Sequence, residues 1–198
     1  MHVTQAAIIE CADELFYQQG FTHTSFAQIA AKVGISRGNF YHHFKTKDAI
    51  LDAVIERRLE KTRHMLKAWE GKSNTPAQRV RCFIKILTTN WSSIRLYGCP
   101  VGTLSTELGK LDHPQRKHAG EVFTVFKDWL VHQFVAMGQQ TLAEEHALHV
   151  LAFSQGTATL ASTYRDKSFV DREIERMCQW LQSLEKSPAG SHSTKGDR

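Results

Sequence analysis

The segment from Phe26 to Phe44 constrains the fold more than any other part of this 198-residue chain. Its apolar residues lie at helical spacing on both sides of Gly34, which predicts two short helices joined by a tight turn. Two helices that meet at a steep angle need a small residue where they approach and a residue that tolerates a positive φ at the turn. Ala30 and Gly34 supply these two needs. The segment is therefore typical of a helix-turn-helix.

The second of these helices, expected at about residues 36–44 with Ser36 as its cap, carries small and polar residues on its outer side. The outward residues are Arg37, Gly38, Asn39, Tyr41 and His42. Arginine and asparagine bond base edges in the major groove of DNA, and a glycine lets the backbone come close to it. The pattern predicts a helix that reads DNA.

Candidates for binding phosphate surround this helix. Thr24 or Ser25, at the start of the first short helix, can offer a hydroxyl and a backbone N–H to a phosphate oxygen. Tyr41, His42 and Lys47 are the other candidates. Together they predict contacts with the phosphates of the DNA backbone around the reading helix.

The charge distribution agrees with an anionic partner. The formal net charge is +5, and the stretch from Lys32 to Lys47 contains no carboxylate. Its basic residues are Lys32, Arg37, Lys45 and Lys47.

Three alternatives stay open: a three-helix bundle with a solvated basic face, a helical module that binds protein partners without specific DNA recognition, and sequence-indifferent binding to nucleic acid.

The rest of the chain also has helical spacing, so we expect an all-α fold of about nine helices. The first helix should end at Gly20. Further helices are expected from Thr46 to about Trp69, from Thr75–Pro76 onward, after the stretch 112–114, and at about residues 142–164 and 168–184. We expect a helix-turn-helix domain at residues 1–47, a ligand-binding and dimerisation domain at 48–187, and a disordered tail at 188–198.

Several classes of protein do not fit the sequence. It has no apolar run long enough to span a bilayer and no secretion signal at its start, and its four cysteines lack a CxxC spacing. We therefore expect a cytoplasmic protein with reduced thiols. His146 and His149 are three residues apart but lack a third ligand at good spacing, so no metal site is expected. No motif for catalysis or for a cofactor is present, and we expect no enzyme activity.

The stretch GFTHTSFAQIAAKVGISRGNFYHHFKTKDAIL resembles the amino-terminal domain of the TetR family of bacterial repressors, over about residues 4–52. The resemblance implies phosphate contacts from Thr24, Tyr41 and Lys47, and groove contacts from residues 36–42. Asn39 stands where many members carry Thr or Ser, so the base preference of a relative cannot be transferred to this chain.

The resemblance also implies a homodimer, because the last two helices of each subunit pair with those of a second subunit in that family. Such a dimer would bind a palindromic operator and be released by a small-molecule inducer, with the fourth helix as the lever. The candidate apolar residues for an inducer pocket are Phe83, Leu87, Trp91, Leu104, Leu108, Phe123, Phe126, Trp129, Leu130 and Phe153.

A second possibility for sensing concerns Cys99. Gly98, Pro100 and Gly102 break the helix around it, and this break resembles a TetR subgroup of which some members respond to electrophiles or oxidants. A thiolate is stabilised near a helix N-terminus. Against this, no neighbouring Lys or Arg in the local sequence activates the thiol. Cys99 is thus either a sensor or a plain pocket residue.

Overall fold

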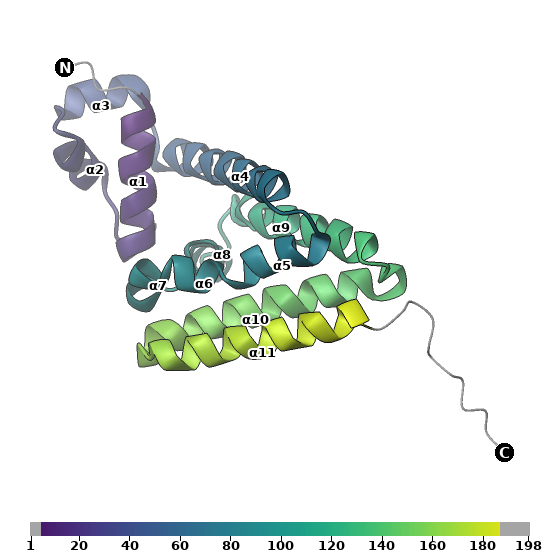
Figure 1. Ribbon diagram of the computed structural model, residues 1–198. Coiled ribbons are helices and arrows are strands. Elements are labelled where there is room, and N and C mark those ends of the chain that lie inside the picture. Colours follow the sequence, from purple (N-terminus) through teal and green to yellow (C-terminus); the bar gives the residue numbers. More distant parts are fainter. Residues whose placement is uncertain (1–4, 187–198) are drawn as a thin grey trace. The chain divides into compact units, whose positions relative to one another are not determined.

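The computed structural model describes residues 5–186, and within this range all regular structure is helical (Figure 1). This confirms the predicted all-α class. The predicted tail at 188–198 lies outside the described residues. The elements are α1 (Gln5–Gln19), α2 (Phe26–Val33), α3 (Arg37–His43), α4 (Lys47–Lys72), α5 (Pro76–Ile84), α6 (Ile86–Thr89), α7 (Trp91–Tyr97), α8 (Pro100–Lys110), α9 (Arg116–Ala136), the 3-10 turn η1 (Gln140–Leu142), α10 (Ala143–Tyr164) and α11 (Lys167–Lys186).

The described residues form eleven α-helices rather than about nine, because the single helix expected after Thr75 is divided into α5, α6 and α7. Lys85 and Asn90 separate the three pieces, and their ψ angles of −4° and 17° depart from helical geometry. The hydroxyl of Thr89 donates to the carbonyl of Lys85 at 3.3 Å. Side-chain hydrogen bonds of this kind compete with the backbone ladder and bend helices.

The described chain forms two compact units, each considered by itself. The first comprises residues 5–65 and 96–125, and the second comprises residues 66–95 and 126–186. The helix-turn-helix segment, the first part of α4, all of α8 and the start of α9 thus belong to one unit. The helices α4, α7 and α9 contribute residues to both units.

The core of the first unit includes the apolar faces of α1 to α4. Its buried side chains include Ile8, Ala12, Phe16, Ile29, Phe40, Phe44, Ile50, Leu51 and Val54. Ile8, Cys11, Ala12 and Phe16 form the buried side of α1. Each isoleucine, leucine or phenylalanine removed from water in this way contributes about 1.5–3 kcal/mol to stability.

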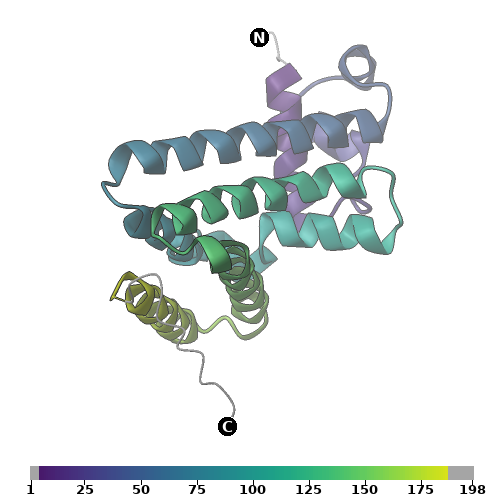
Figure 2. The same cartoon turned by 90° about the vertical axis from the view of Figure 1, so that its right-hand side faces the viewer.

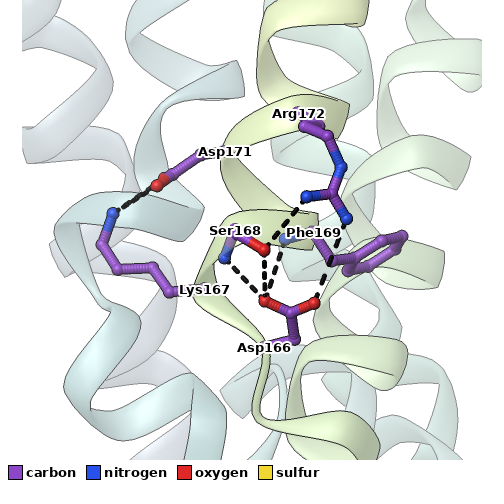
Figure 3. Close-up of polar contacts among 6 residues, drawn as sticks. All are labelled: Asp166, Lys167, Ser168, Phe169, Asp171 and Arg172. Carbon is purple, nitrogen blue, oxygen red and sulfur yellow. Dashed lines mark hydrogen bonds and ion pairs between the residues drawn. The ribbon is translucent and has the colours of Figure 1, made fainter.

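In the second unit, α10 and α11 lie side by side as a helical hairpin (Figures 1 and 2). Arg165 ends α10 in the left-handed conformation, with a φ of +55°. Asp166 then begins α11, since its Oδ1 accepts the N–H of Ser168 at 2.8 Å and that of Phe169 at 3.2 Å (Figure 3). The Ser168 hydroxyl donates to the same oxygen at 2.7 Å, so the turn is held by a local polar network.

No helix among residues 5–186 is both long enough and apolar enough to cross a membrane. The same residues contain no cluster of three side chains suited to a metal ion. Cys11, Cys82, Cys99 and Cys178 form no disulfide in the described structure.

Candidate DNA interface

Local hydrogen bonds fix the start of α2 and the turn that follows it. The Ser25 hydroxyl accepts the N–H of Gln28 at 3.3 Å, and the Gln28 side chain accepts the N–H of Ser25 at 2.7 Å. This reciprocal capping box satisfies donors that the first helical turn leaves unpaired. At the other end Gly34 has a φ of +80° and donates to the carbonyls of Ala30 and Ala31. The predicted need for glycine at the turn is confirmed.

The second short helix, α3, begins where its sequence cap predicts. The Ser36 hydroxyl accepts the N–H of Asn39 at 3.2 Å, and Phe44 ends the helix with an extended backbone. Ile29, Ala30 and Phe40 are buried between the helices, whereas Val33 and Ile35 are half-buried. These residues form the apolar contact between α2 and α3.

The outer side of α3 is exposed and polar. The exposed residues are Ser36, Gly38, Asn39, Tyr41 and His42, and the structure describes Arg37 only by its place at the start of the helix. The Tyr41 ring packs edge-on against Phe26, at 5.5 Å between ring centroids, while 46% of Tyr41 remains exposed. Beside it is a surface depression of about 240 Å³, lined by Ser25, Phe26, Ala27, Ala30, Phe40 and Tyr41.

Two of the predicted phosphate ligands are already engaged within the protein. Thr24 is only 1% exposed, and its hydroxyl donates to the Gly20 carbonyl at 2.8 Å. Lys47 donates to the Thr22 carbonyl at 3.2 Å and lies 4.2 Å from the centroid of the Phe21 ring. Burial lowers the pKa of Lys47, and the nearby carboxylates Glu107 and Asp48 partly offset this effect. Ser25 is exposed at the start of α2.

Helix α4 begins beside this surface. The Thr46 hydroxyl accepts the N–H of Ala49 at 3.1 Å, and Asp48 lies in the first turn, where a negative charge is favoured. The helix then continues without a break to Lys72. The predicted long fourth helix, capped by Thr46, is confirmed.

Comparison with known proteins matches two family models to the chain. The model described as "Bacterial regulatory proteins, tetR family" matches residues 8–54, and "Transcriptional regulator LmrA/YxaF-like, C-terminal domain" matches residues 76–175, half of the chain. The chain belongs to the TetR family. It is therefore a DNA-binding transcriptional regulator and not a member of an enzyme family.

Individual transcriptional regulators are similar to this chain over most of their length. An uncharacterized HTH-type transcriptional regulator of Lactococcus lactis is 25% identical over 178 residues, which cover 87% of this chain and 90% of that protein. The regulator YxaF of Bacillus subtilis is 25% identical over 167 residues, 81% of this chain and 86% of that protein. A TetR regulator from Legionella pneumophila has the same fold, with a TM-score of 0.80 at 22% identity over 91% of this chain and 98% of that one.

The predicted pocket residues of this TetR-family chain are distributed over both compact units. Phe83, Leu87, Trp91, Phe123, Phe126, Trp129, Leu130 and Phe153 are all buried or half-buried, as are Cys99, Leu104 and Leu108. Cys99, Leu104, Leu108 and Phe123 belong to the first unit, and the others belong to the second. Within the second unit the Phe83 and Phe126 rings meet edge-on at 5.2 Å, and Trp129 Nε1 donates to Glu70 at 2.9 Å. Their contact with a ligand stays a prediction.

Cys99 caps the N-terminus of α8. Its sulfur accepts the N–H of Gly102 at 3.5 Å, and its carbonyl accepts the Thr103 hydroxyl at 2.8 Å. Next to it, Tyr17 Oη donates to the Gly98 carbonyl at 2.7 Å. Burial, together with the neighbouring Cys99, raises the pKa of Tyr17 to about 12, so the phenol keeps its proton.

Sequence reasoning missed residues that hold the helix-turn-helix from α4 and α8. Glu107 of α8 accepts two backbone N–H groups of the turn before α2. Arg58 of α4 donates to Asp13 of α1 at 2.7 Å and to the Pro100 carbonyl at 2.6 Å. No local pattern marks either residue, because their partners are more than 40 residues away along the chain.

Proposed function

We propose that this regulator binds a palindromic DNA operator as a homodimer and is released from it by a small molecule. The observation that carries the proposal is the exposed outer side of α3, which presents Gly38, Asn39, Tyr41 and His42 within a stretch that has no carboxylate. We assign DNA binding to residues 1–47 and ligand binding and dimerisation to residues 48–187. We infer that it acts in the cytoplasm, where the operator DNA of a bacterial regulator lies.

Asn39 is the residue best placed to read a base. Its side chain is exposed, and only its backbone N–H is used in capping α3. An asparagine amide pairs with the N6 and N7 edge of adenine, and such a pair provides about 1–3 kcal/mol of discrimination. Gly38 is exposed, and a Cβ there would meet only the Ser36 hydroxyl at 4.0 Å, so the backbone is open to close approach. Arg37 is the other candidate for base contact.

The phosphate contacts would come from the edges of this surface. The exposed candidates are Ser25 at the start of α2 and Tyr41 and His42 of α3. Lys47 can join them while it keeps its bond to the Thr22 carbonyl, because an ammonium group has three donors. The Thr24 hydroxyl has one proton, so it would have to release the Gly20 carbonyl to donate to a phosphate. Lys47→Ala should therefore weaken binding to all sequences alike and reduce the salt slope by about one.

The hairpin of α10 and α11 supports dimerisation. Leu148, Leu160 and Tyr164 are large apolar residues of α10 that are at least 41% exposed. Between them Ala152 and Gly156 are also exposed, which would let a second helix approach closely. A two-fold dimer would place its reading helices about 34–36 Å apart, one turn of DNA. Leu160→Glu should yield a monomer in sedimentation, whereas Leu111→Glu, at an exposed leucine of the other unit, should not.

For release by ligand, we propose that a small apolar molecule binds in the helical body. It would shift α5 to α9 and tilt α4, and so change the spacing of the two reading helices. Ligand and DNA would then oppose each other by a coupling free energy of about 1–3 kcal/mol. A thermal-shift screen of apolar and electrophilic molecules would find such a ligand.

Sensing of electrophiles by Cys99 is a second candidate for this release. The sulfur lies at the N-terminus of α8 and accepts the N–H of Gly102 at 3.5 Å. Cys99→Ser should then abolish release of DNA by a thiol-reactive electrophile. If the serine variant responds as the wild type does, the thiol mechanism is wrong.

The function is tested by selecting duplexes from a random DNA library with the full-length protein. We expect an inverted repeat whose half-sites are about one helical turn apart. Enrichment of no sequence would contradict the proposal and favour the alternatives, a protein-interaction module or sequence-indifferent binding.

A further inference from the structure

The turn between α1 and α2, residues 20–25, is held from outside by a side chain that lies 85 residues further along the chain. Oε2 of Glu107 accepts the N–H of Phe21 at 2.8 Å, and Oε1 accepts the N–H of Thr22, also at 2.8 Å. Hydrogen bonds from neutral donors to a carboxylate are roughly twice as strong as those between neutral groups. One side chain thus fixes two consecutive peptide groups at the entrance to α2.

The same turn is held at its other polar groups. Lys47 donates to the Thr22 carbonyl at 3.2 Å, so the donor and the acceptor of this residue are both bound by charged side chains. Inside the turn, the Thr24 hydroxyl donates to the Gly20 carbonyl. Phe21 is buried, and its ring is edge-on to Phe16 and to His113. The turn therefore cannot move far unless its hydrogen bonds to Glu107 of α8 are broken.

Helix α8 is attached to the same part of the chain at its other end. Tyr17 Oη donates to the Gly98 carbonyl, and Arg58 joins the Pro100 carbonyl to Asp13. The segment that leads into α8 is thus joined to the second half of α1, directly at Tyr17 and through Arg58 at Asp13, and Glu107 contacts the turn that follows α1. All of these residues belong to the first compact unit. A displacement of α8 would be transmitted to α2 through bonds at two points.

We propose that Glu107 is a positioning residue for DNA recognition: its carboxylate fixes the Phe21–Thr22 turn and thereby the orientation from which α2 and α3 meet the operator. This inference rests on the proposed function, since it assumes that α2 and α3 bind DNA. It assigns to α8, and not only to α4, a contact with the turn that leads into α2. The role is distinct from that of a phosphate or base ligand, because Glu107 acts through the backbone of the turn.

The test compares Glu107→Ala and Glu107→Gln with two matched controls in the full-length protein. Thr106→Ala changes an exposed neighbour on the same helix, and Glu121→Gln removes an exposed carboxylate of α9. Glutamine keeps the shape of Glu107 but offers one acceptor oxygen and places an NH₂ group against the other N–H. It provides a folded variant should the alanine variant not fold. Affinity is measured for the duplex selected by the wild type, at a temperature where circular dichroism shows every variant to be folded.

We expect both Glu107 variants to bind the selected duplex about tenfold more weakly, with the controls within about twofold of the wild type. Amide hydrogen exchange should show loss of protection at Phe21 and Thr22 in the Glu107 variants while the α10–α11 hairpin keeps its protection. Wild-type affinity in the folded Glu107 variants, or unchanged exchange at the two amides, would overturn the inference. A wild-type protein that selects no duplex would overturn the proposed function instead, and the exchange measurement would still decide whether Glu107 holds the turn.

Discussion

A Cβ atom on Gly20 would lie 3.0 Å from Oε2 and 3.1 Å from Oε1 of Glu107. Gly20 also has a φ of +89°, in the left-handed region that favours glycine. The residue therefore meets two requirements: it lets the chain turn after α1, and it leaves room for the carboxylate that binds the following two amides.

Replacement of Gly20 by alanine should destabilise the protein more than replacement of Gly34. Both positions have positive φ, which costs an L-residue about 1–2 kcal/mol, but a Cβ on Gly34 would meet nothing within 4 Å. Only Gly20→Ala displaces Glu107 in addition. In urea unfolding, the double variant Gly20→Ala/Glu107→Ala should lose less stability than the sum of the two single variants. Additive losses would show that the two residues are not coupled.

The stability contributed by Glu107 should depend on pH. Burial alone would raise the pKa of Glu107, but the N–H groups of Thr22 and Phe21 outweigh it, and the net pKa is below the ordinary value of 4.5. A carboxyl group whose pKa is lower in the folded state stabilises it above the unfolded value, and this contribution is lost as pH falls through the folded value. The difference in free energy of unfolding between wild type and Glu107→Gln should thus be full at neutral pH and shrink below about pH 4.5. If the difference in free energy of unfolding grew as the pH fell, the prediction would be wrong.

Arg58 and Arg57 are adjacent in sequence but should differ in their effect on stability. Arg58 is 8% exposed and joins Asp13 to the Pro100 carbonyl, so its removal leaves a carboxylate and a carbonyl without their partner. The pair is part-buried, with side-chain exposures of 9% for Arg58 and 19% for Asp13, and loss of such a charged hydrogen bond costs about 1.5–3 kcal/mol. Arg57 pairs with Glu10 at the surface, and its replacement should cost less than about 1 kcal/mol. Urea unfolding of Arg58→Ala and Arg57→Ala measures both values, and equal losses would contradict the assignment.

The turn between α10 and α11 should depend on Asp166 more than on Asp171. The Ser168 hydroxyl and the N–H groups of Phe169 and Ser168 hold the pKa of Asp166 below its ordinary value (Figure 3). Asp171, in contrast, pairs with the exposed Lys167 one turn away. Asp166→Ala should lower the melting temperature at neutral pH more than Asp171→Ala does, and acid should reduce this difference. A larger effect at Asp171 would contradict a capping role for Asp166.

The reading helices are the part of the molecule that sequence predicts best. Ser36 caps α3 as the sequence predicts, Ser25 is the one of the two candidates that caps α2, and Gly34 has the left-handed conformation that its position requires. These features are predictable because a cap or a turn is decided by residues within four positions along the chain.

Contacts between distant segments could not be predicted in this way. Nothing near Glu107 in the sequence distinguishes it from a glutamate on the surface of a helix. Its role depends on two backbone amides that are 85 and 86 residues away along the chain. The sequence predicts Lys47 as a phosphate ligand but does not indicate its bond to the Thr22 carbonyl. Gly20 lies against the Glu107 carboxylate, but in the sequence it indicates only the end of a helix.

The most direct test of the proposed function measures how strongly α3 distinguishes one DNA sequence from another. Fluorescence anisotropy at a fixed salt concentration would give the Kd of the wild type and of Asn39→Ala for the selected duplex and for a scrambled duplex of the same length. We expect the wild type to prefer the selected duplex by a factor of about 10³ or more, and Asn39→Ala to reduce that preference about tenfold without weakening binding to the scrambled duplex. Equal affinity of the wild type for the two duplexes, or an equal loss on both in the variant, would contradict the assignment of α3 as the helix that reads DNA.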